Sequence, residues 1–257
     1  MTDNTSSANE RTSRLKAWWT SRAGGPFIAE LAIASGLLLM YRGVRSFTRT
    51  DLSDAFRHAR LVVELEHWLG AFIEDDIQSM LLHHPDLIRG LNHYYLWMHF
   101  PIAVGLLLWA YCRHPQKYSV VRTEMALLTF AALVLHVVFP LAPPRMMPGF
   151  VDTMMRFGPS IYPRSALEGT ANQIAAMPSL HFGWALLAAL WFLRLTAGRL
   201  RTLVLVHPAV MLLAIIATAN HWWIDAAAAA LLTAAVRQYS RFDQLLSRRR
   251  QPSAAQY

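Results

Sequence analysis

Apolar residues of this chain gather into runs that polar stretches separate. Six runs of about 15 to 22 residues can be distinguished, and each is roughly long enough to cross ~30 Å of hydrocarbon. These runs are Pro26–Val44, Leu91–Cys112, Val120–Leu141, Leu180–Leu195, Leu203–Ala219 and Trp222–Val236. Because hydrocarbon offers backbone polar groups no partner, we expect all six to be helices. The pattern therefore predicts an all-α fold, a polytopic membrane protein with a six-transmembrane-helix bundle.

Two long segments between these runs differ in character. Thr50–Arg89 interleaves apolar residues with charges at near-helical spacing, which favours an interfacial helix between spans one and two. A solvated cap packed on the bundle is the alternative for that segment. Ala142–Pro178 is rich in proline and glycine and therefore cannot form one continuous helix. A loop of that length is usually functional or disordered.

Composition supports a single membrane domain. The chain is 54% hydrophobic and 16% charged, which is typical of a membrane protein rather than of a large soluble core. We expect a cytoplasmic N-terminal tail at 1–25, the six-helix domain at 26–240 and a basic cytoplasmic C-terminal tail at 241–257. With both termini inside, 15 lysines and arginines lie on the inner side and nine on the outer side, which follows the positive-inside rule.

The net charge of +8 does not indicate nucleic-acid binding, because the basic residues are dispersed among loop ends and a short C-terminal run. Anionic lipid headgroups explain them better. Cys112 is the sole cysteine, at the inner end of the second run, so neither an internal disulfide nor a cysteine metal cage can form. We expect no cofactor.

Ionisable residues inside spans are costly and indicate function, and here they gather at one depth. With the termini inside, the outer ends of four helices carry His93, His99, His136, His181, and the pair His221 and Asp225. Arg145 directly follows the outer end of the third run. The pattern predicts one polar pocket that opens outward.

The spacing of His221 and Asp225 points to a nucleophile. Positions i and i+4 share one helical face about one turn apart, so the carboxylate reaches the imidazole. If Asp225 accepts the Nδ1 hydrogen, Nε2 keeps its lone pair and the positive charge that develops on attack at phosphorus is stabilised. The alternative is a structural His/Asp pair at a helix start.

Four further residues suit a phosphate site beside that pair. Pro178 and Ser179 fit the start of a helix, whose free N–H groups and dipole favour an anion. His181 would then act as general acid toward the leaving oxygen, and the planar fork of Arg145 would hold two phosphate oxygens. The alternatives are a capping or core histidine and an arginine that snorkels to the interface.

At these residues the sequence resembles the type-2 phosphatidic acid phosphatase superfamily, whose members carry Pro-Ser-x-His and a later His-x-x-x-Asp in a six-helix bundle. Pro178-Ser179-Leu180-His181 and His221-x-x-x-Asp225 match in order and spacing. Pro143-Pro144-Arg145, Met177 before the first motif, and Asn220-His221 resemble the branch that includes inositol phosphorylceramide synthases. The resemblance covers roughly Glu64 to Val236.

The resemblance implies a phosphohistidine on His221, oriented by Asp225, with His181 as acid and then base, Arg145 as phosphate clamp, and no metal. The chain departs from the family at two cationic positions, where Val138 and Ile215 stand in place of a lysine and an arginine. The interpretation gives their role to Arg164, with Arg156, Asn172, Gln173 and Asn220 as other candidates. Ser179 and Asn220 complete the predicted phosphate-binding set with Arg145 and Arg164.

The sequence therefore predicts a metal-independent enzyme that takes the phosphate of a membrane lipid at the outer leaflet and passes it to water or to an alcohol acceptor. The branch resemblance favours transfer of a phospho-headgroup to an alcohol. His93, Tyr94, Tyr95 and His99 are either part of the headgroup side of the pocket or interface anchors. The rival functions are a proton-relay transporter, and a zinc-dependent hydrolase that uses His99, His136, His181 and His221 with Asp225.

Overall fold

The computed structural model describes residues 28, 32, 35–36, 52–159 and 174–250, with side chains up to residue 243. The chain divides into two compact units, Met1–Phe47 and Thr48–Tyr257. In the first unit only four positions are described, all of them helical. The predicted N-terminal tail and nearly all of the predicted first span, Pro26–Val44, thus lie outside the described residues, and the fold below is that of the second unit.

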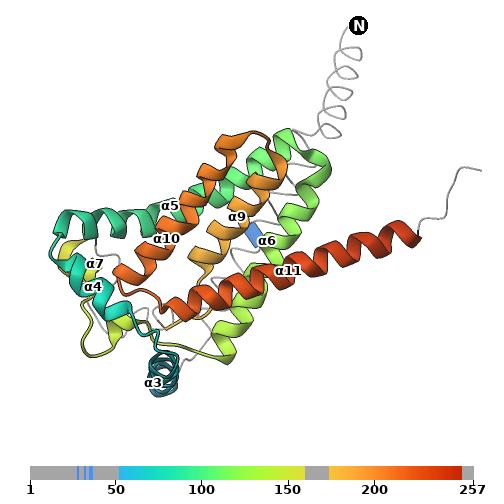
Figure 1. Cartoon of the computed structure of the whole chain (residues 1–257). Helices are drawn as coiled ribbons and strands as arrows, with labels where there is room; N and C mark the ends of the chain where they lie inside the picture. Colours follow the sequence, from blue (N-terminus) through green and yellow to red (C-terminus); the bar gives the residue numbers. More distant parts are fainter. Residues whose placement is uncertain (1–27, 29–31, 33–34, 37–51, 160–173, 251–257) are drawn as a thin grey trace, which may run out of the picture. The chain divides into compact units, whose positions relative to one another are not determined.

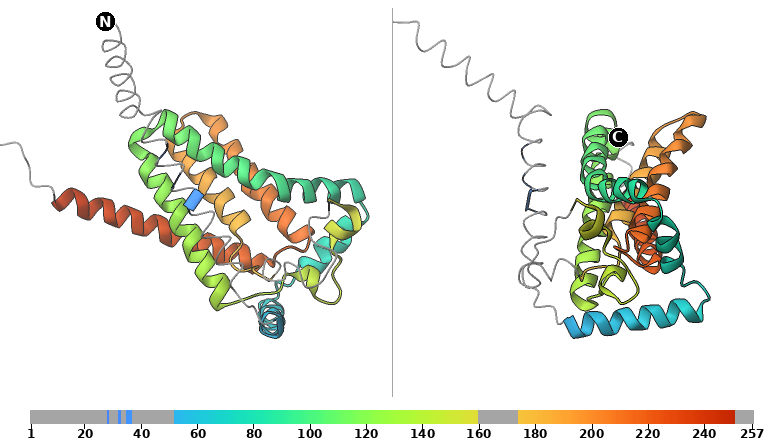
Figure 2. Two further views of the ribbon diagram at one scale, coloured as in Figure 1. Left: turned by 180° about the vertical axis from the view of Figure 1, so that it is seen from behind. Right: turned by 90° about the vertical axis from the view of Figure 1, so that its left-hand side faces the viewer.

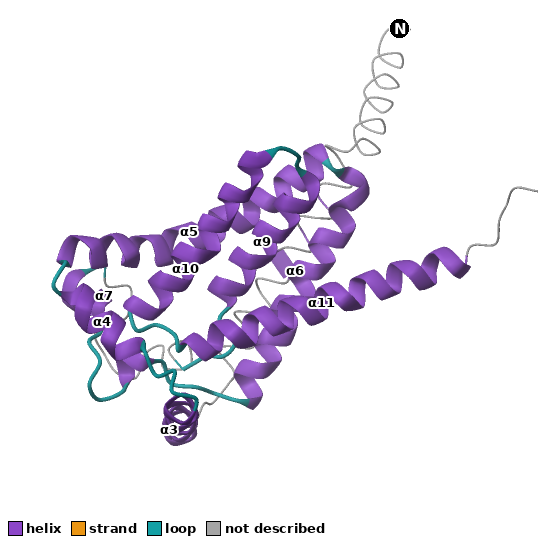
Figure 3. Ribbon diagram, in the orientation of Figure 1, coloured by secondary structure: helices purple, strands orange, loops and turns teal. Residues whose placement is uncertain are grey.

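The second unit is built of helices, and no strand occurs among its described residues (Figure 3). Three helices are long and apolar enough to cross a membrane: Pro85–Arg113, Pro115–Val138 and Arg199–Ala217. The first two are α5 and α6, and the third joins the 3₁₀ helix η2 (Arg199–Leu205) to α10 (Val206–Ala217). A shorter apolar helix, α9, covers Leu180–Leu195, and α11 covers Trp223–Arg250. The described part of the chain is therefore helical, and its three long apolar helices indicate a membrane protein.

The predicted runs and the observed helices agree most closely in the middle of the chain. The helix α9 has the predicted bounds, and α5 and α6 contain most of the second and third runs. The third run was expected to continue to Leu141, but α6 ends at Val138. At the other end of the chain, α11 continues past residue 240, where the C-terminal tail was predicted to begin.

The helix α9 packs against α5, α6, α10 and α11, and it lies between them in the bundle (Figure 1). Gly183 lies where three helices meet. A Cβ atom at Gly183 would lie 3.5 Å from a methyl carbon of Leu128 on α6 and 3.6 Å from Cβ of Ala229 on α11. These are ordinary van der Waals distances, so a methyl group would fit near the start of α9, in contact with both neighbouring helices.

The segment between the first two predicted spans forms two helices, α3 (Leu52–Trp68) and α4 (Glu74–Leu82). Gly70, at φ +64°, lies in the break between them, a conformation that glycine adopts without steric cost. The buried face of α3 packs with the residues that follow α6 and with Trp222. A backbone hydrogen bond of 3.2 Å from Ala142 to Ala55 joins the two segments. The helix α3 therefore covers the end of the bundle where α6 stops and α11 begins (Figures 1 and 2).

The proline-rich segment after α6 is not a continuous helix, as predicted. It contains the short helices η1 (Pro144–Met146) and α7 (Thr153–Phe157), and Leu141 pairs with Ala175 in an isolated parallel bridge. The carboxylate of Asp152 accepts a 2.9 Å hydrogen bond from the N–H of Met155 and so caps α7. Residues 160–173, which include Arg164, Asn172 and Gln173, lie outside the described residues.

The sole cysteine lies at the far end of α5 from the covered end of the bundle. Cys112 is exposed and directly precedes Arg113, the last residue of the helix. At about 1.5 Å of rise per residue, it lies on the order of 20 Å along the helix from His99.

Candidate active site

A tight turn between α10 and α11 positions His221. Ala219 adopts φ +54°, which an L-residue other than glycine rarely does, and the N–H groups of both Asn220 and His221 donate to the carbonyl of Ile215, at 3.0 and 3.1 Å. This turn ends α10 and brings the His221 ring back toward the axis of α11. His221 itself precedes α11, which begins at Trp223, so the prediction that both members of the pair lie on one helical face was wrong in that respect.

The pair itself is nonetheless formed. Nδ1 of His221 lies 3.2 Å from Oδ2 of Asp225 and 2.8 Å from the carbonyl oxygen of Ala176. Both partners are acceptors when Asp225 is ionised, so Nδ1 carries the hydrogen and Nε2 holds the lone pair. The two side chains are 7% and 0% exposed. The arrangement therefore fixes one tautomer of a buried imidazole.

Asp225 also connects three segments of the site. Its Oδ2 accepts a 3.0 Å hydrogen bond from the N–H of Trp222, which satisfies a free donor at the start of α11. Its backbone carbonyl accepts a 3.1 Å hydrogen bond from the N–H of Ser179. The start of α9 is thereby tied to the first turn of α11.

Ser179 caps α9 as the sequence predicted. Its Oγ accepts a 3.4 Å hydrogen bond from the N–H of Phe182, and its φ and ψ are extended, as is usual for an N-cap residue. The carbonyl of the preceding Pro178 lies 3.1 Å from Nε2 of His136, a buried residue of α6. His136, which only the rival zinc-hydrolase interpretation makes a metal ligand, thus contacts the loop before α9.

His181 lies in the first turn of α9, and its ring centroid is 6.0 Å from that of His221, at an interplanar angle of 56°. Two residues of α5 contact the same ring. Tyr95 stacks on His181 with a centroid separation of 4.1 Å, and His99 lies at 4.2 Å with a tilt of 35°. His99 in turn stacks on Trp184 at 4.4 Å. Tyr95 and His99 therefore belong to the wall of the site.

The other two residues of the predicted headgroup set lie elsewhere on α5. The hydroxyl of Tyr94 lies 2.6 Å from Nδ1 of His207 on α10, and His93 is exposed. In the described part of the chain, neither Tyr94 nor His93 contacts the ring of His181 or of His221.

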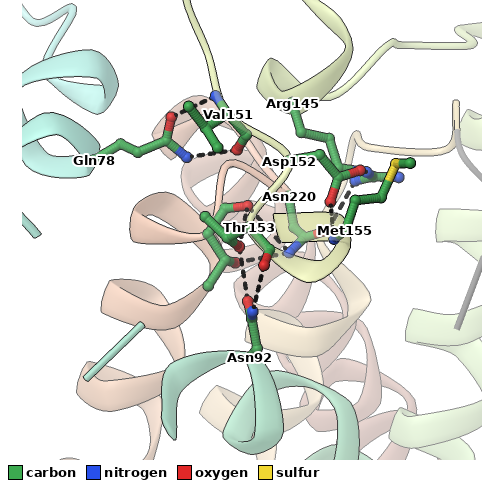
Figure 4. A network of polar contacts seen from close by, with 9 residues as sticks. Gln78, Asn92, Arg145, Val151, Asp152, Thr153, Met155 and Asn220 are labelled. Atoms are coloured by element: carbon green, nitrogen blue, oxygen red, sulfur yellow. Dashed lines mark hydrogen bonds and ion pairs between the residues drawn. The ribbon is translucent and has the colours of Figure 1, made fainter. Parts of the chain in front are cut away.

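Arg145 lies on η1 and is joined to the turn that carries His221 (Figure 4). Its N–H donates to the carbonyl of Ala219 at 2.8 Å, and its Nη1 donates to Oδ1 of Asn220 at 2.8 Å. Nε lies 3.7 Å from Oδ2 of Asp152, and the arginine side chain is 4% exposed. Asn220 also donates to Oγ1 of Thr218 at 2.7 Å. The guanidinium and the Asn220 amide are thus fixed next to the predicted nucleophile in the chain.

A polar network that sequence reasoning missed holds the loop between η1 and α7 in place (Figure 4). The amide of Gln78 on α4 makes two hydrogen bonds, 2.9 and 3.0 Å long, with the backbone of Val151. Asn92 on α5 accepts a 2.8 Å hydrogen bond from Thr153 Oγ1 and donates to the Thr153 carbonyl at 3.0 Å. These contacts position Asp152, which lies between Val151 and Thr153 and faces Arg145.

The sequence analysis also missed two buried glutamates near the start of α11. Glu66 on α3 and Glu74 on α4 are both 0% exposed. Oε1 of Glu74 accepts a 2.8 Å hydrogen bond from the N–H of Trp223, the first residue of α11. Burial, followed by the charges of Glu74 and Asp225, raises the pKa of Glu66 to about 9, and burial also raises the pKa of Glu74.

The positions that depart from the family motifs have different surroundings. Val138 is the last residue of α6 and is 71% exposed, whereas Ile215 is fully buried in α10. Of the proposed substitutes, Arg156 lies on α7, where its guanidinium is 5.3 Å from the ring centroid of Phe157. Within the described part of the chain, no three histidine, cysteine or acidic side chains lie together in a way that could hold a metal ion.

The comparison with family models gives one result that covers most of the chain. The model of the PAP2 superfamily matches residues 60–237, a range that begins in α3, ends in α11 and contains every residue of the site above. The comparison with curated proteins gives no match, and neither does the comparison with solved structures.

Proposed function

This chain belongs to the PAP2 superfamily, whose members are phosphatases, and on that premise we propose that it is a membrane enzyme that removes or transfers the phosphate of a lipid through His221. Family membership supports an enzyme of lipid phosphates. The residue roles, the acceptor and the side of the membrane are our proposal.

The observation that carries the proposal is the pair of acceptors at Nδ1 of His221. With Nδ1–H shared between Ala176 O and Asp225 Oδ2, the lone pair belongs to Nε2. Nε2 forms a bond to phosphorus while the bond from phosphorus to the lipid oxygen breaks. The imidazole gains positive charge in this step, and the buried carboxylate of Asp225 stabilises that charge.

His181 acts as the general acid in the first half-reaction and as the general base in the second. As an imidazolium it gives its proton to the departing lipid oxygen, and as a neutral imidazole it then takes a proton from the water or alcohol that attacks the phosphohistidine. The bond from phosphorus to Nε2 breaks in that second step, and the lone pair returns to His221. The 6.0 Å separation of the two rings suits groups that act on opposite sides of one phosphorus atom.

The phosphate oxygens are held from two directions. Ser179 and the first N–H groups of α9 supply one set of donors, and a helix N-terminus favours an anion. The guanidinium of Arg145 and the amide of Asn220 supply the other. Arg164 remains our candidate for a further cation, because the segment that carries it joins Pro159 to the Leu141–Ala175 bridge beside the site.

We further propose the placement in the membrane. The helix α9 and the first half of α11 cross the membrane together with α5, α6 and the η2–α10 helix, and the predicted run Pro26–Val44 is counted as a sixth span. The site then opens to the outer leaflet, with α3 in the interface, where Leu61, Leu65 and Trp68 are 41 to 78% exposed. The resemblance to the inositol phosphorylceramide synthase branch favours an alcohol as the acceptor.

The test uses the full chain in detergent–lipid mixed micelles with a panel of ³²P-labelled lipid phosphates. We expect release of phosphate, a covalent label that is stable in alkali and labile in acid, and loss of both in His221→Ala. An alcohol panel, inositol included, distinguishes a transferase from a phosphatase by the labelled product. Activity that survives His221→Ala removes the proposed nucleophile, and activity that a chelator abolishes favours the zinc hydrolase.

A further inference from the structure

Three buried carboxyl groups meet at the N-terminus of α11. Glu66 comes from α3, Glu74 from α4 and Asp225 from α11 itself, and all three are 0% exposed. Their contacts differ. Glu74 accepts hydrogen bonds from the N–H of Trp223 at 2.8 Å and from its neighbour Ile73 at 3.0 Å, one on each oxygen.

Glu66 has no comparable donors. Among the described residues no amide, hydroxyl or cation makes a well-formed hydrogen bond to either of its oxygens, although the N–H of Ile224 and the carboxyl of Glu74 lie close enough to affect its pKa. A buried carboxylate in this position would be costly, since it lacks both solvent and a counter-charge. A buried carboxylic acid, by contrast, has a hydrogen to donate to the neighbouring Glu74.

The charges around Glu66 also favour its neutral, protonated form. It faces Glu74 on α4 and Asp225 on α11, and beyond Asp225 lies His221. On its own helix the adjacent His67 is exposed and stacks on Phe72. The partial positive charge at one helix N-terminus is too small to stabilise three buried carboxylates, so one of the three keeps a proton. Asp225 accepts hydrogen bonds from two donors and so does Glu74, whereas neither oxygen of Glu66 accepts a well-formed one, which leaves Glu66 as the protonated group.

We propose that Glu66 and Glu74 share one proton as a carboxylic acid–carboxylate pair, and that this pair fixes the first turn of α11 and thereby positions Asp225 and His221. Glu74 holds the N–H of Trp223, and Asp225 follows two residues later. Glu66 donates its hydrogen to Glu74 and keeps that carboxylate in place. Both are positioning residues, and their effect on turnover rests on the function proposed above.

The consequence is an alkaline limit to activity. Loss of the shared proton places two adjacent charges under the first turn of α11, where they repel each other and Asp225. The turn then loses its fixed position, and the rate falls at alkaline pH.

The amide variants of the two glutamates test the pair because they have opposite expected effects. Glu66→Gln replaces the acid with an amide that donates to Glu74 at every pH, so it should restore the activity that Glu66→Ala loses. Deprotonation of His181 lowers the rate of both proteins in alkali, but Glu66→Gln should keep a larger share of its neutral-pH rate above pH 9 than the wild type does. Glu74→Gln puts an NH₂ group against one of two N–H donors, so it should lower the rate at every pH. Glu64→Gln, on the exposed face of α3, is the matched control and should keep the wild-type profile.

A spectroscopic measurement tests the shared proton of Glu66 and Glu74 independently of the proposed enzymatic activity. The infrared band of a protonated carboxyl group should be present in the wild type at neutral pH, disappear on alkaline titration and be absent in Glu66→Gln. A Glu66→Gln variant with the wild-type band and the wild-type alkaline limb would overturn the proposal even if the lipid phosphatase activity is found. The carboxyl band and its disappearance on alkaline titration would support the shared proton of Glu66 and Glu74 even if the enzyme acts on another class of substrate.

Discussion

Nη1 of Arg145 donates a 2.8 Å hydrogen bond to the side chain of Asn220, the residue directly before His221. The same guanidinium lies 3.7 Å from Asp152, whose loop Gln78 and Asn92 hold in place. A cation that is 4% exposed and so closely oriented is suited to hold an anion at a fixed distance from the proposed nucleophile, His221.

Arg145→Lys should therefore impair activity although the charge is kept. A lysine has one point charge instead of a planar fork, so it cannot contact Asn220, Asp152 and phosphate together. We expect kcat/KM for the lipid phosphate to fall about 10²-fold, which corresponds to the loss of a charge-assisted hydrogen bond or two. Arg57→Lys, at an exposed arginine of α3 that pairs with Asp54, is the control, and an equal loss there would argue against a specific clamp.

Asp225→Asn should separate charge from geometry. Oδ2 of Asp225 accepts from both His221 and Trp222, and an asparagine oxygen can take that place while the amide nitrogen occupies the other position. The fold should persist, but the charge that stabilises the phosphohistidine is lost. We expect kcat to fall about 10²- to 10⁴-fold, as when the orienting carboxylate of a catalytic triad becomes an amide. A thermal midpoint near that of the wild type, measured on the same sample, verifies that folding is intact.

Two substitutions of Gly183 should have opposite effects on stability. The contacts that a Cβ would make, 3.5 Å to Leu128 and 3.6 Å to Ala229, are ordinary van der Waals distances. Gly183→Ala should therefore be tolerated and gain up to about 1 kcal/mol of helix propensity. Gly183→Leu should cost about 1 to 3 kcal/mol by overpacking α9 against α6 and α11. Denaturant titration in a mild detergent measures both, and equal stability of the two variants would contradict the packing described.

The free energy of unfolding should decrease as pH rises from about 4.5 to about 9. The pKa of Glu66 is 4.5 as an ordinary value and about 9 in the fold, because burial and the charges of Glu74 and Asp225 oppose its ionisation. In that interval the folded protein holds a proton that the unfolded chain releases, so unfolding is favoured by alkali, by up to about 1.4 kcal/mol per pH unit. Glu66→Gln should make the profile flatter. A wild-type stability that rises over this range would refute the assignment.

Much of this fold could be predicted from the apolar runs of the sequence, because backbone polar groups in hydrocarbon must pair with one another and a helix pairs them within one segment. The bounds of α9, its Ser179 cap and the contact between His221 and Asp225 were predictable for that reason. The position of His221 outside α11 was not, since it depends on the left-handed conformation of Ala219, where no glycine marks the turn.

Glu66 illustrates a different kind of failure. It continues the buried stripe of α3 after Ala55, Ala59 and Val62 at helical spacing, but a charged residue in an otherwise mixed segment is normally taken to face solvent. Its burial depends on α4 and the first turn of α11, where Glu74, Ile224 and Asp225 lie near it and which come from other parts of the chain. Periodicity places a side chain on a face of its own helix, and only the fold shows what covers that face.

Cys112 gives the chain a natural reporter of its orientation. As the sole thiol, exposed at the end of α5 remote from His99, it marks the face opposite the proposed catalytic residues without any engineered substitution. A maleimide that cannot enter intact cells should leave Cys112 unmodified until the membrane is permeabilised if the catalytic pocket faces outward. Modification of sealed cells would place the phosphate chemistry on the cytoplasmic side and make the enzyme's substrates those of the inner leaflet.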